Sequence, residues 1–333
     1  MRTKSIAVTV AMLSTTALLA ACSGSGMSGT QSAIPGSGTQ SQSHRLPLEA
    51  TGVAPKFLAQ LRFGQHLARP NAAPIKDLAV SDFGTGAVEV LNGTYGLGST
   101  ITNGLNGPDG DWYDKKGNLY VANYGGVNVT EYNKAESLTS TYSSGLIDPV
   151  GVTTDKSGNV YVADYGDGSA SVVVEYPQGS NSPITSCNTG LANEGIVVDK
   201  HGNVFVSGNN PNTGQGDLLE YSGGLSGCSA TTLPITFSFA GGLQIDKHGN
   251  LVACDQLVGV DIIPPPYTSV GSTITGTSDA FHVALSLKQK VLYIADPGNA
   301  DVLVDKYPSG TPVTSLGSGN GLSDPAGVAT YGK

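Results

Sequence analysis

Positive charge is scarce in this sequence. All four arginines lie at or before Arg69, and from Asp77 onward ten lysines stand against 25 acidic residues, a difference of −15. Recognition of nucleic acid phosphates usually requires arginine side chains or a basic stripe. The composition therefore predicts that nucleic acid is not a partner. Charged residues make up only 13% of the chain, whereas it has 46 glycines, which favours short strands and many turns.

The common catalytic motifs are also absent. The sequence contains no His-Glu-x-x-His, no Cys-x-x-Cys, no Gly-Lys-Ser/Thr phosphate loop and no Gly-x-Ser-x-Gly. Glycine clusters such as residues 317–321 lie between predicted strands with no helix after them, so we interpret them as turns. The motifs by themselves therefore indicate no catalytic centre.

A short apolar run lies near the start of the sequence. Arg2 and Lys4 precede it, it spans residues 6–20, and it ends in Leu19-Ala20-Ala21-Cys22. A positive segment followed by a run too short to cross a bilayer comfortably is typical of an export signal. The final tetrapeptide resembles the lipobox of bacterial lipoproteins, whose cysteine becomes the new N-terminus and carries acyl chains.

The lipobox resemblance implies a signal peptide over residues 1–21, lipidation of Cys22, and a protein anchored to a membrane of the cell envelope. Two or more acyl chains anchor a protein stably, whereas one chain holds it only marginally. Ser23 follows the cysteine, and a residue other than Asp there implies the outer membrane if the source is Gram-negative. The alternative is an ordinary cleaved signal peptide in which the cysteine occurs by chance.

Two further segments precede the body of the chain. Residues 22–44 are mostly Ser, Gly, Gln and Thr, so we predict a flexible tether with a typical reach of about 25 Å. Residues 45–75 form an N-terminal extension. Its stretch 55–63 fits either a short amphipathic helix on the body or an ordered strap, and both alternatives stay open.

Residues 76–333 carry an internal repeat. Its clearest copy is Asp155-Lys156-Ser157-Gly158-Asn159-Val160-Tyr161-Val162-Ala163-Asp164. The second strand of each unit starts at 77, 118, 159, 203, 250 and 291, a spacing of 41 to 47 residues. The pattern predicts four short strands in each unit. The Asp-x-x-Gly-Asn motif is the predicted turn between the first two strands, because Asp accepts hydrogen bonds from nearby amides and Gly adopts positive φ. Four antiparallel strands at this period are typical of a β-propeller blade.

The two ends of the repeat region complement each other. Residues 325–330 match the first strand of the other units, whereas the first unit lacks this strand and starts at its second. We therefore predict an all-β, six-bladed β-propeller with four antiparallel strands per blade, in which the C-terminal strand joins the N-terminal blade. Such closure removes an exposed sheet edge.

The repeats resemble the NHL family and its relatives, the gluconolactonase-like and streptogramin-lyase-like propellers. The resemblance rests on residues 149–164 and their copies and covers about residues 76–330. It implies the propeller fold. It does not indicate one function, because that superfamily includes enzymes, binding modules and scaffolds.

The residue before each glycine of the first strands should lie near the propeller axis. Two of these six residues, Asp109 and Glu194, are carboxylates, and His282 replaces one of the glycines. The gluconolactonase-like resemblance implies a divalent metal at this level, with Asp109 and Glu194 as matching ligands, and oxygen ligands suit Ca²⁺. The alternative is that both acids only solvate the mouth of the channel.

Asp111 is unusual because its equivalents in the other units form an apolar column: Val152, Ile196, Leu243, Val283 and Val328. A carboxylate at such a position is partnered, exposed by a local shift of the strand, or functional. We favour a local shift near Trp112. Asp109, Glu194, His282 and Asp111 are the channel-face candidates.

Aromatic residues occupy matching loop positions in three consecutive blades: Phe83, Tyr124 and Tyr165. Aromatics on a rim stack against sugars or peptide side chains, and the alternative is packing between loops. The residues that precede them, such as Asp82 and Asp164, recur too regularly to form one active site, so we predict that they brace the loops.

The cysteines after Cys22 allow one disulfide. An exported protein is permitted disulfides, and Cys187 and Cys228 fall in the outer parts of adjacent blades, which predicts that they pair. Cys254 lies in a second strand and is expected to be buried.

The sequence leaves two functions open. The first is a membrane-anchored binding module for a protein, peptide or glycan, with its site on the channel face. The second is a metal-dependent, lactonase-like hydrolase or lyase. An enzyme needs several convergent polar side chains, and the sequence offers few, so we favour the binding module.

Overall fold

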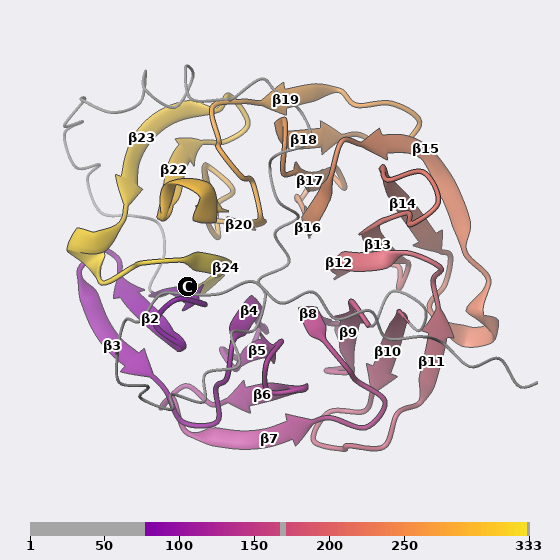
Figure 1. The fold of residues 1–333 in the computed structure, drawn as a ribbon, viewed down its shortest axis with the longest axis horizontal. Coiled ribbons are helices and arrows are strands. Elements are labelled where there is room, and N and C mark those ends of the chain that lie inside the picture. The colour runs from indigo at the N-terminus through magenta and orange to yellow at the C-terminus, as the bar shows by residue number, and fades with distance from the viewer. Residues whose placement is uncertain (1–76, 167–170, 332–333) are drawn as a thin grey trace, which may run out of the picture. The chain divides into compact units, whose positions relative to one another are not determined.

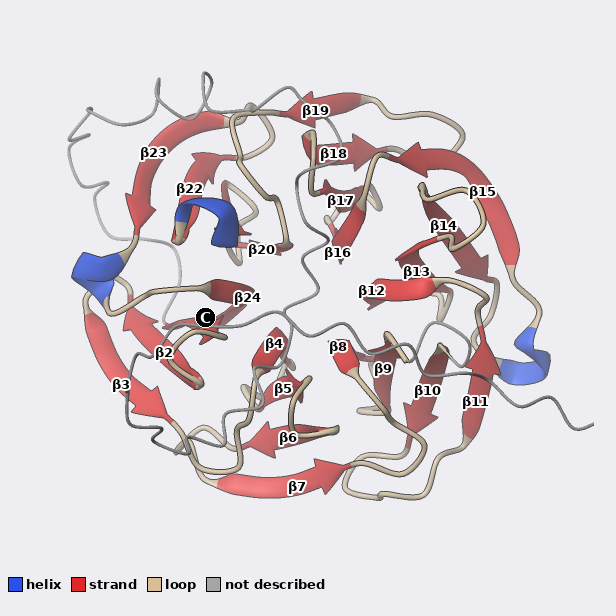
Figure 2. Cartoon of the chain, viewed as in Figure 1, coloured by secondary structure: helices blue, strands red, loops and turns tan. Residues whose placement is uncertain are grey.

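The computed structural model describes residues 77–166 and 171–331, which form six four-stranded antiparallel sheets around a central axis (Figure 1). Helical structure in these residues is limited to short 3₁₀ turns (Figure 2). This confirms the predicted all-β, six-bladed propeller. The predicted signal peptide, Cys22, the tether and the N-terminal extension lie outside the described residues.

Each blade contains four consecutive strands, except that blade 1 takes its innermost strand from the C-terminus. Blade 1 consists of β24 (Pro325–Tyr331), β1 (Asp77–Asp82), β2 (Ala87–Asn92) and β3 (Leu97–Ile101). Blade 2 consists of β4 (Pro108–Tyr113), β5 (Leu119–Asn123), β6 (Asn128–Tyr132) and β7 (Leu138–Tyr142). Blade 3 consists of β8 (Pro149–Thr154), β9 (Val160–Asp164), β10 (Val172–Tyr176) and β11 (Thr185–Asn188).

The remaining three blades follow the same order from the axis outward. Blade 4 consists of β12 (Ala192–Val198), β13 (Val204–Asn209), β14 (Gly216–Tyr221) and β15 (Thr231–Phe237). Blade 5 consists of β16 (Ala240–Ile245), β17 (Leu251–Asp255), β18 (Gly259–Ile263) and β19 (Ser272–Ile274). Blade 6 consists of β20 (His282–Leu285), β21 (Val291–Asp296), β22 (Asp301–Lys306) and β23 (Thr311–Leu316).

The repeated Asp-x-x-Gly-Asn motif forms the turn between the first two strands of a blade. In blade 3, Asp155 Oδ1 accepts hydrogen bonds from the backbone N–H groups of Ser157 at 2.7 Å and Asn159 at 2.9 Å. Gly158 has a φ of 93°, which the glycine allows without strain. The Asp of each motif therefore satisfies turn amides that no strand partner reaches.

The C-terminal strand closes the ring. β24 pairs with β1 in antiparallel register, with Ala79 opposite Ala329 and Val80 opposite Val328. Each innermost strand also contacts the innermost strands of both neighbouring blades. The Thr330 hydroxyl donates to the carbonyl of Leu285 in blade 6 at 2.6 Å, which ties the last strand to the blade beside it.

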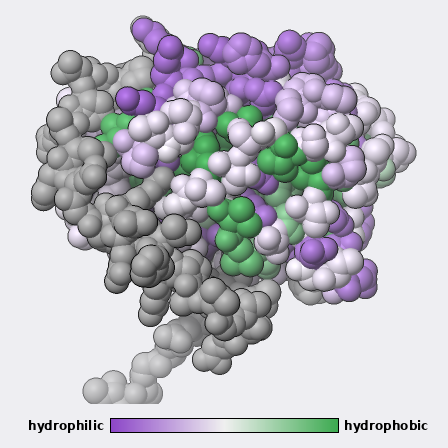
Figure 3. Space-filling model, turned by 90° about the horizontal axis from the view of Figure 1, so that it is seen from above, coloured by the Kyte–Doolittle hydropathy of each residue, from purple (hydrophilic) through white to green (hydrophobic). Residues whose placement is uncertain are grey.

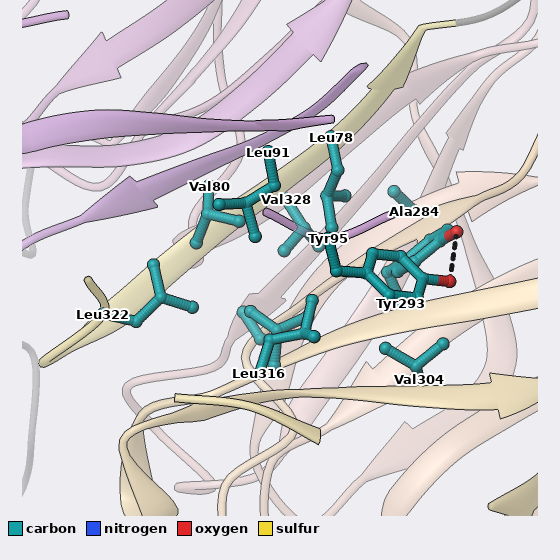
Figure 4. Packing of buried hydrophobic residues seen from close by; sticks show 12 residues of the cluster. Leu78, Val80, Leu91, Tyr95, Ala284, Tyr293, Val304, Leu316, Leu322 and Val328 are labelled. Atoms are coloured by element: carbon teal, nitrogen blue, oxygen red, sulfur yellow. Dashed lines mark hydrogen bonds between the residues drawn. The ribbon is translucent and has the colours of Figure 1, made fainter. Parts of the chain in front are cut away.

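The hydrophobic core consists of six clusters, one between each pair of neighbouring blades. The cluster between blades 6 and 1 contains Leu78 and Val328 from blade 1 and Tyr293 from blade 6 (Figure 4). The hydroxyls of Tyr95 and Tyr293 lie 3.2 Å apart across this boundary. Because each cluster is shared by two neighbouring blades, stability depends on contacts between blades. On the surface, viewed at 90° to Figure 1, hydrophobic residues form small groups among polar ones (Figure 3).

Cys187 of β11 and Cys228, which lies between β14 and β15, form a disulfide with Cα atoms 5.2 Å apart. It joins the outer strand of blade 3 to blade 4. Cys254 is buried and has a free thiol.

We expect the Cys187→Ser/Cys228→Ser variant to unfold with a free energy lower by about 2–4 kcal/mol, because the bridge closes a long loop in the unfolded chain. Thermal unfolding with and without a reductant measures this effect. The reductant should lower the melting temperature of the wild type and leave that of the double variant unchanged. Equal responses of the two proteins would show that the bridge does not form.

Candidate functional site: the central channel

Two faces of the propeller border the channel. We call the face on which the innermost strands begin the start face, and the face that carries the Asp-x-x-Gly-Asn turns the turn face. Each innermost strand contributes one residue to each of three levels, counted from the start face inward. In β4 the first, middle and third levels are Asp109, Gly110 and Asp111. Inner strands therefore place equivalent residues around the axis (Figure 1).

The middle level contains glycine in five blades: Gly110, Gly151, Gly195, Gly242 and Gly327. The inner strands approach closely here. A Cβ atom on Gly195 would lie only 2.8 Å from the carbonyl oxygen of Gly241. A side chain at Gly195 would therefore push the neighbouring inner strands apart.

His282 takes the glycine position in blade 6, and its ring lies across the axis. A Cβ atom on Gly110 would lie 2.8 Å from Cε1 of His282, and one on Gly242 would lie 2.5 Å from Nδ1. Since Gly110 and Gly242 belong to blades 2 and 5, on opposite sides of the ring, the imidazole fills the space between them. Burial lowers the pKa of His282 to about 4, so the ring is neutral at neutral pH.

Asp109 and Glu194 lie on the start side of the imidazole and are buried. Oδ1 of Asp109 is 3.7 Å from Nε2 of His282, and Oε1 of Glu194 accepts a hydrogen bond from Asn209 at 3.1 Å. Burial raises the pKa of Asp109 well above its ordinary value, and the charge of Asp324 adds to this. Burial, followed by the charge of Asp109, likewise raises the pKa of Glu194.

These two carboxylates do not form a complete metal site. They supply at most four oxygens, whereas Ca²⁺ takes about six to eight. In residues 77–166 and 171–331, no three His, Cys, Asp or Glu side chains are grouped so that they could hold a metal ion. The metal site at Asp109 and Glu194 stays a prediction.

Asp111 keeps the position of its apolar equivalents. It lies opposite Val121 in the neighbouring strand, as Val152 lies opposite Val162. The expected local shift is therefore wrong. The strand pairing of β4 with β5 shifts register just before Asp111. The same register shift occurs in β8, β12 and β16, so it is a common feature of the inner strands. Asp111 is instead buried and partnered, because Ser81 donates to its Oδ2 at 3.3 Å.

A cavity of about 350 Å³ lies on the turn side of His282. We call it the turn-side cavity. Asp111 and its five aliphatic equivalents surround it: Val152, Ile196, Leu243, Val283 and Val328. Trp112, Tyr113 and Lys115 also line it. The sequence predicts every ligand on the start face and does not indicate this cavity, although the one carboxylate in an apolar column was a signal for it.

The three rim aromatics lie together on the start face, and each is half-buried. The N–H of Tyr124 donates to the carbonyl of Gly107 at 2.9 Å, and a Cβ atom on Gly107 would lie 3.1 Å from the ring of Phe83. Burial raises the pKa of Tyr124, and the nearby charge of Asp148 and the ring of Tyr165 add to this. We call Phe83, Tyr124 and Tyr165 the aromatic arc; Tyr124 and Tyr165 also pack against the core cluster between blades 3 and 4.

The residues before these aromatics have the bracing role that the sequence predicts. Asp164 accepts backbone hydrogen bonds from Ile147 at 2.6 Å, Asp148 at 3.0 Å and Gly166 at 2.9 Å. Asp82 does the same for Thr85 in its own loop and for Asp324 in the chain that leads into β24. They hold the aromatic arc in place.

The two faces differ in charge. The nine lysines of the described residues all lie on the turn-face side, in or beside turns between strands: Lys115, Lys116, Lys134, Lys156, Lys200, Lys247, Lys288, Lys290 and Lys306. The described start-face loops contain neither lysine nor arginine, and they carry Asp148, Asp279 and Asp324. Among charged residues, the described start-face loops therefore carry acids alone.

No family model and no curated protein sequence matches this chain. Solved structures do resemble it in fold. A nidogen/laminin complex matches with a TM-score of 0.62 at 15% identity, over 76% of this chain and 97% of that one. A protein of unknown function from Bacteroides caccae matches with a TM-score of 0.59 at 13% identity, over 78% of this chain and 100% of that one.

A streptogramin B lyase structure matches with a TM-score of 0.50 at 8% identity, over 72% of this chain and 73% of that one. Identities this low show the propeller fold alone. The neighbours include both a protein complex and a lyase, so the fold does not choose between binding and catalysis.

Proposed function

We propose that this chain is a lipid-anchored binding module of the cell envelope, and that its start face binds a positively charged segment of a protein or peptide. The observation that carries the proposal is the combination of the acids in the described start-face loops with the aromatic arc on the same face. Aromatic side chains supply contact area, and a field of one sign selects partners of the opposite charge. The match to a nidogen/laminin complex is in keeping with a propeller that binds protein.

The arrangement of the acids favours binding over catalysis. Asp109 and Glu194 are buried on the start side of His282. Among the described residues, Glu194 accepts a hydrogen bond from Asn209 and Asp109 lies 3.7 Å from His282, and none of these four side chains is a hydroxyl or thiol nucleophile. The acids of the described start-face loops, Asp148, Asp279 and Asp324, lie on the same face as the aromatic residues.

Oligolysine is a suitable probe for this face. We expect fluorescein-labelled hexalysine to bind at low ionic strength and hexaglutamate not to bind, as measured by fluorescence anisotropy. Asp148→Asn/Asp279→Asn should weaken binding about tenfold, and salt should weaken it further. Tyr124→Ser/Tyr165→Ser tests the aromatic arc.

The matched control for this experiment is Glu136→Gln/Glu220→Gln, which removes two charges from the turn-face side of the same propeller. It should bind hexalysine like the wild type. If the control weakens binding as much as the start-face variant does, net charge rather than this face attracts the peptide, and the proposal fails.

The membrane anchor rests on the lipobox residues. We expect Cys22→Ser to accumulate as unprocessed precursor that takes up no radiolabelled palmitate in a bacterial host, because the variant lacks the thiol that receives the lipid. Replacing residues 1–21 with a cleavable signal should move the propeller from the membrane to the soluble fraction, which membrane fractionation measures. Equal labelling of Cys22→Ser would refute lipidation at this residue.

A further inference from the structure

We propose that the turn-side cavity binds a small molecule with an apolar body and a single ammonium group, and that Asp111 accepts the hydrogen bonds of that group. This site is separate from the start face, because the His282 ring lies across the axis between them. Its test therefore has an outcome independent of the binding function proposed above.

The cavity is suited to a small ligand. Its volume of about 350 Å³ lies near the lower end of the ~300–1,000 Å³ typical of small-molecule sites. Five of the six blades contribute an aliphatic side chain to the ring around it, which suits an apolar body. Polar residues such as Lys115, Gln244 and Gln289 also line it, and Lys115 is exposed to solvent.

Asp111 is the feature that breaks the sixfold pattern. It is only 7% exposed. Its Oδ2 accepts a hydrogen bond from Ser81, whereas its Oδ1 has no hydrogen-bond partner among the described residues. Gly327 lies beside this oxygen, and a Cβ atom there would be 2.9 Å from it, so only a glycine leaves room for the Asp111 carboxyl group at this point. A buried acceptor without a donor is unfavourable until a ligand supplies one.

An ammonium group fits this acceptor better than other ligand groups do. It brings several donors and a positive charge to a carboxylate in an apolar surrounding, where such a pair is stronger than in water. A carboxylate or phosphate on the ligand would instead bring negative charge to an acid whose ionised form burial already disfavours, whereas an ammonium group favours that form.

The cavity contains its own spectroscopic reporter. Trp112 is the only tryptophan of the chain, and it lines the cavity. Its indole N–H donates to the Thr154 hydroxyl at 3.0 Å, which fixes the ring. A ligand in the cavity should therefore change the fluorescence of this one residue.

The experiment titrates phenethylammonium and the neutral 2-phenylethanol into the full chain and follows Trp112 fluorescence and the melting temperature. We expect phenethylammonium to bind and 2-phenylethanol to bind at least about tenfold more weakly. Asp111→Leu, which makes the ring uniformly aliphatic, should weaken phenethylammonium binding about tenfold to a hundredfold. Asp111→Asn, which keeps an acceptor without charge, should fall between.

Two further variants make the result decisive. Val283→Phe fills the cavity without altering Asp111 and should abolish binding, whereas Glu136→Gln removes an exposed acid elsewhere and should leave it unchanged. Equal affinity of the wild type and Asp111→Leu, or of the amine and the alcohol, would overturn the proposal. So would the absence of any Trp112 response to millimolar phenethylammonium in a folded wild-type protein.

Discussion

A chain that ends at Asp324 should lose several kcal/mol of unfolding free energy, out of a total of about 5–15 kcal/mol for a typical domain. The deletion removes β24, and with it the pairing of Val328 with Val80 and the bond from Thr330 to blade 6. The inner edge of β1 would then be exposed in the channel, and unpaired strand edges promote association between chains.

Denaturant unfolding and size-exclusion chromatography measure both effects of this truncation. The matched control is a chain that ends at Tyr331, which keeps the whole of β24 and should unfold like the full-length protein. Closure by the C-terminal strand would be refuted if the chain ending at Asp324 stayed monomeric and kept the melting temperature of the control.

The Asp111→Asn/Glu194→Gln variant should become more stable than the wild type as the pH rises from about 4 to 7. Burial raises the pKa of both carboxyls in the folded protein well above the ordinary value, whereas in the unfolded chain they ionise near pH 4. Between these pKa values the folded state holds more protons than the unfolded chain. The wild type therefore has its full stability below the unfolded pKa and loses it as the pH rises through this window.

The expected size of this effect follows from proton linkage. Each carboxyl that stays protonated in the folded state costs about 1.4 kcal/mol of stability per pH unit above its unfolded pKa. The amides do not titrate, and they keep an acceptor for Ser81 and for Asn209. Urea unfolding at several pH values should give curves for variant and wild type that diverge as the pH increases. Parallel curves, like those expected for the exposed control Glu136→Gln, would contradict the raised pKa values.

Local patterns allowed much of the fold to be predicted from the sequence. The Asp-x-x-Gly-Asn turn acts through its own backbone, so its four clear copies are visible without any tertiary contact. The spacing of second strands set the number of blades. Residues 325–330 identified the closing strand because they match the first strands of the other units, and the first unit lacks that strand. The bracing role of Asp82 and Asp164 followed from their regular recurrence.

The channel was predicted less well, because its properties depend on six strands that are far apart in the sequence. Position along each strand predicted that Asp109, Glu194 and His282 lie near the axis. It could not show that the imidazole of His282 fills the gap between Gly110 and Gly242, since that gap exists only when opposite blades face each other across the axis.

The sequence alone determined the blade count, the closing strand and the apolar column with one carboxylate, because these are repeated local patterns. Only the tertiary structure decided that Asp111 stays in register and lines a cavity, and that the described start-face loops carry acids and the turn face the lysines. These properties arise when residues from all six blades converge, and burial then shifts pKa values by a desolvation that no single strand produces.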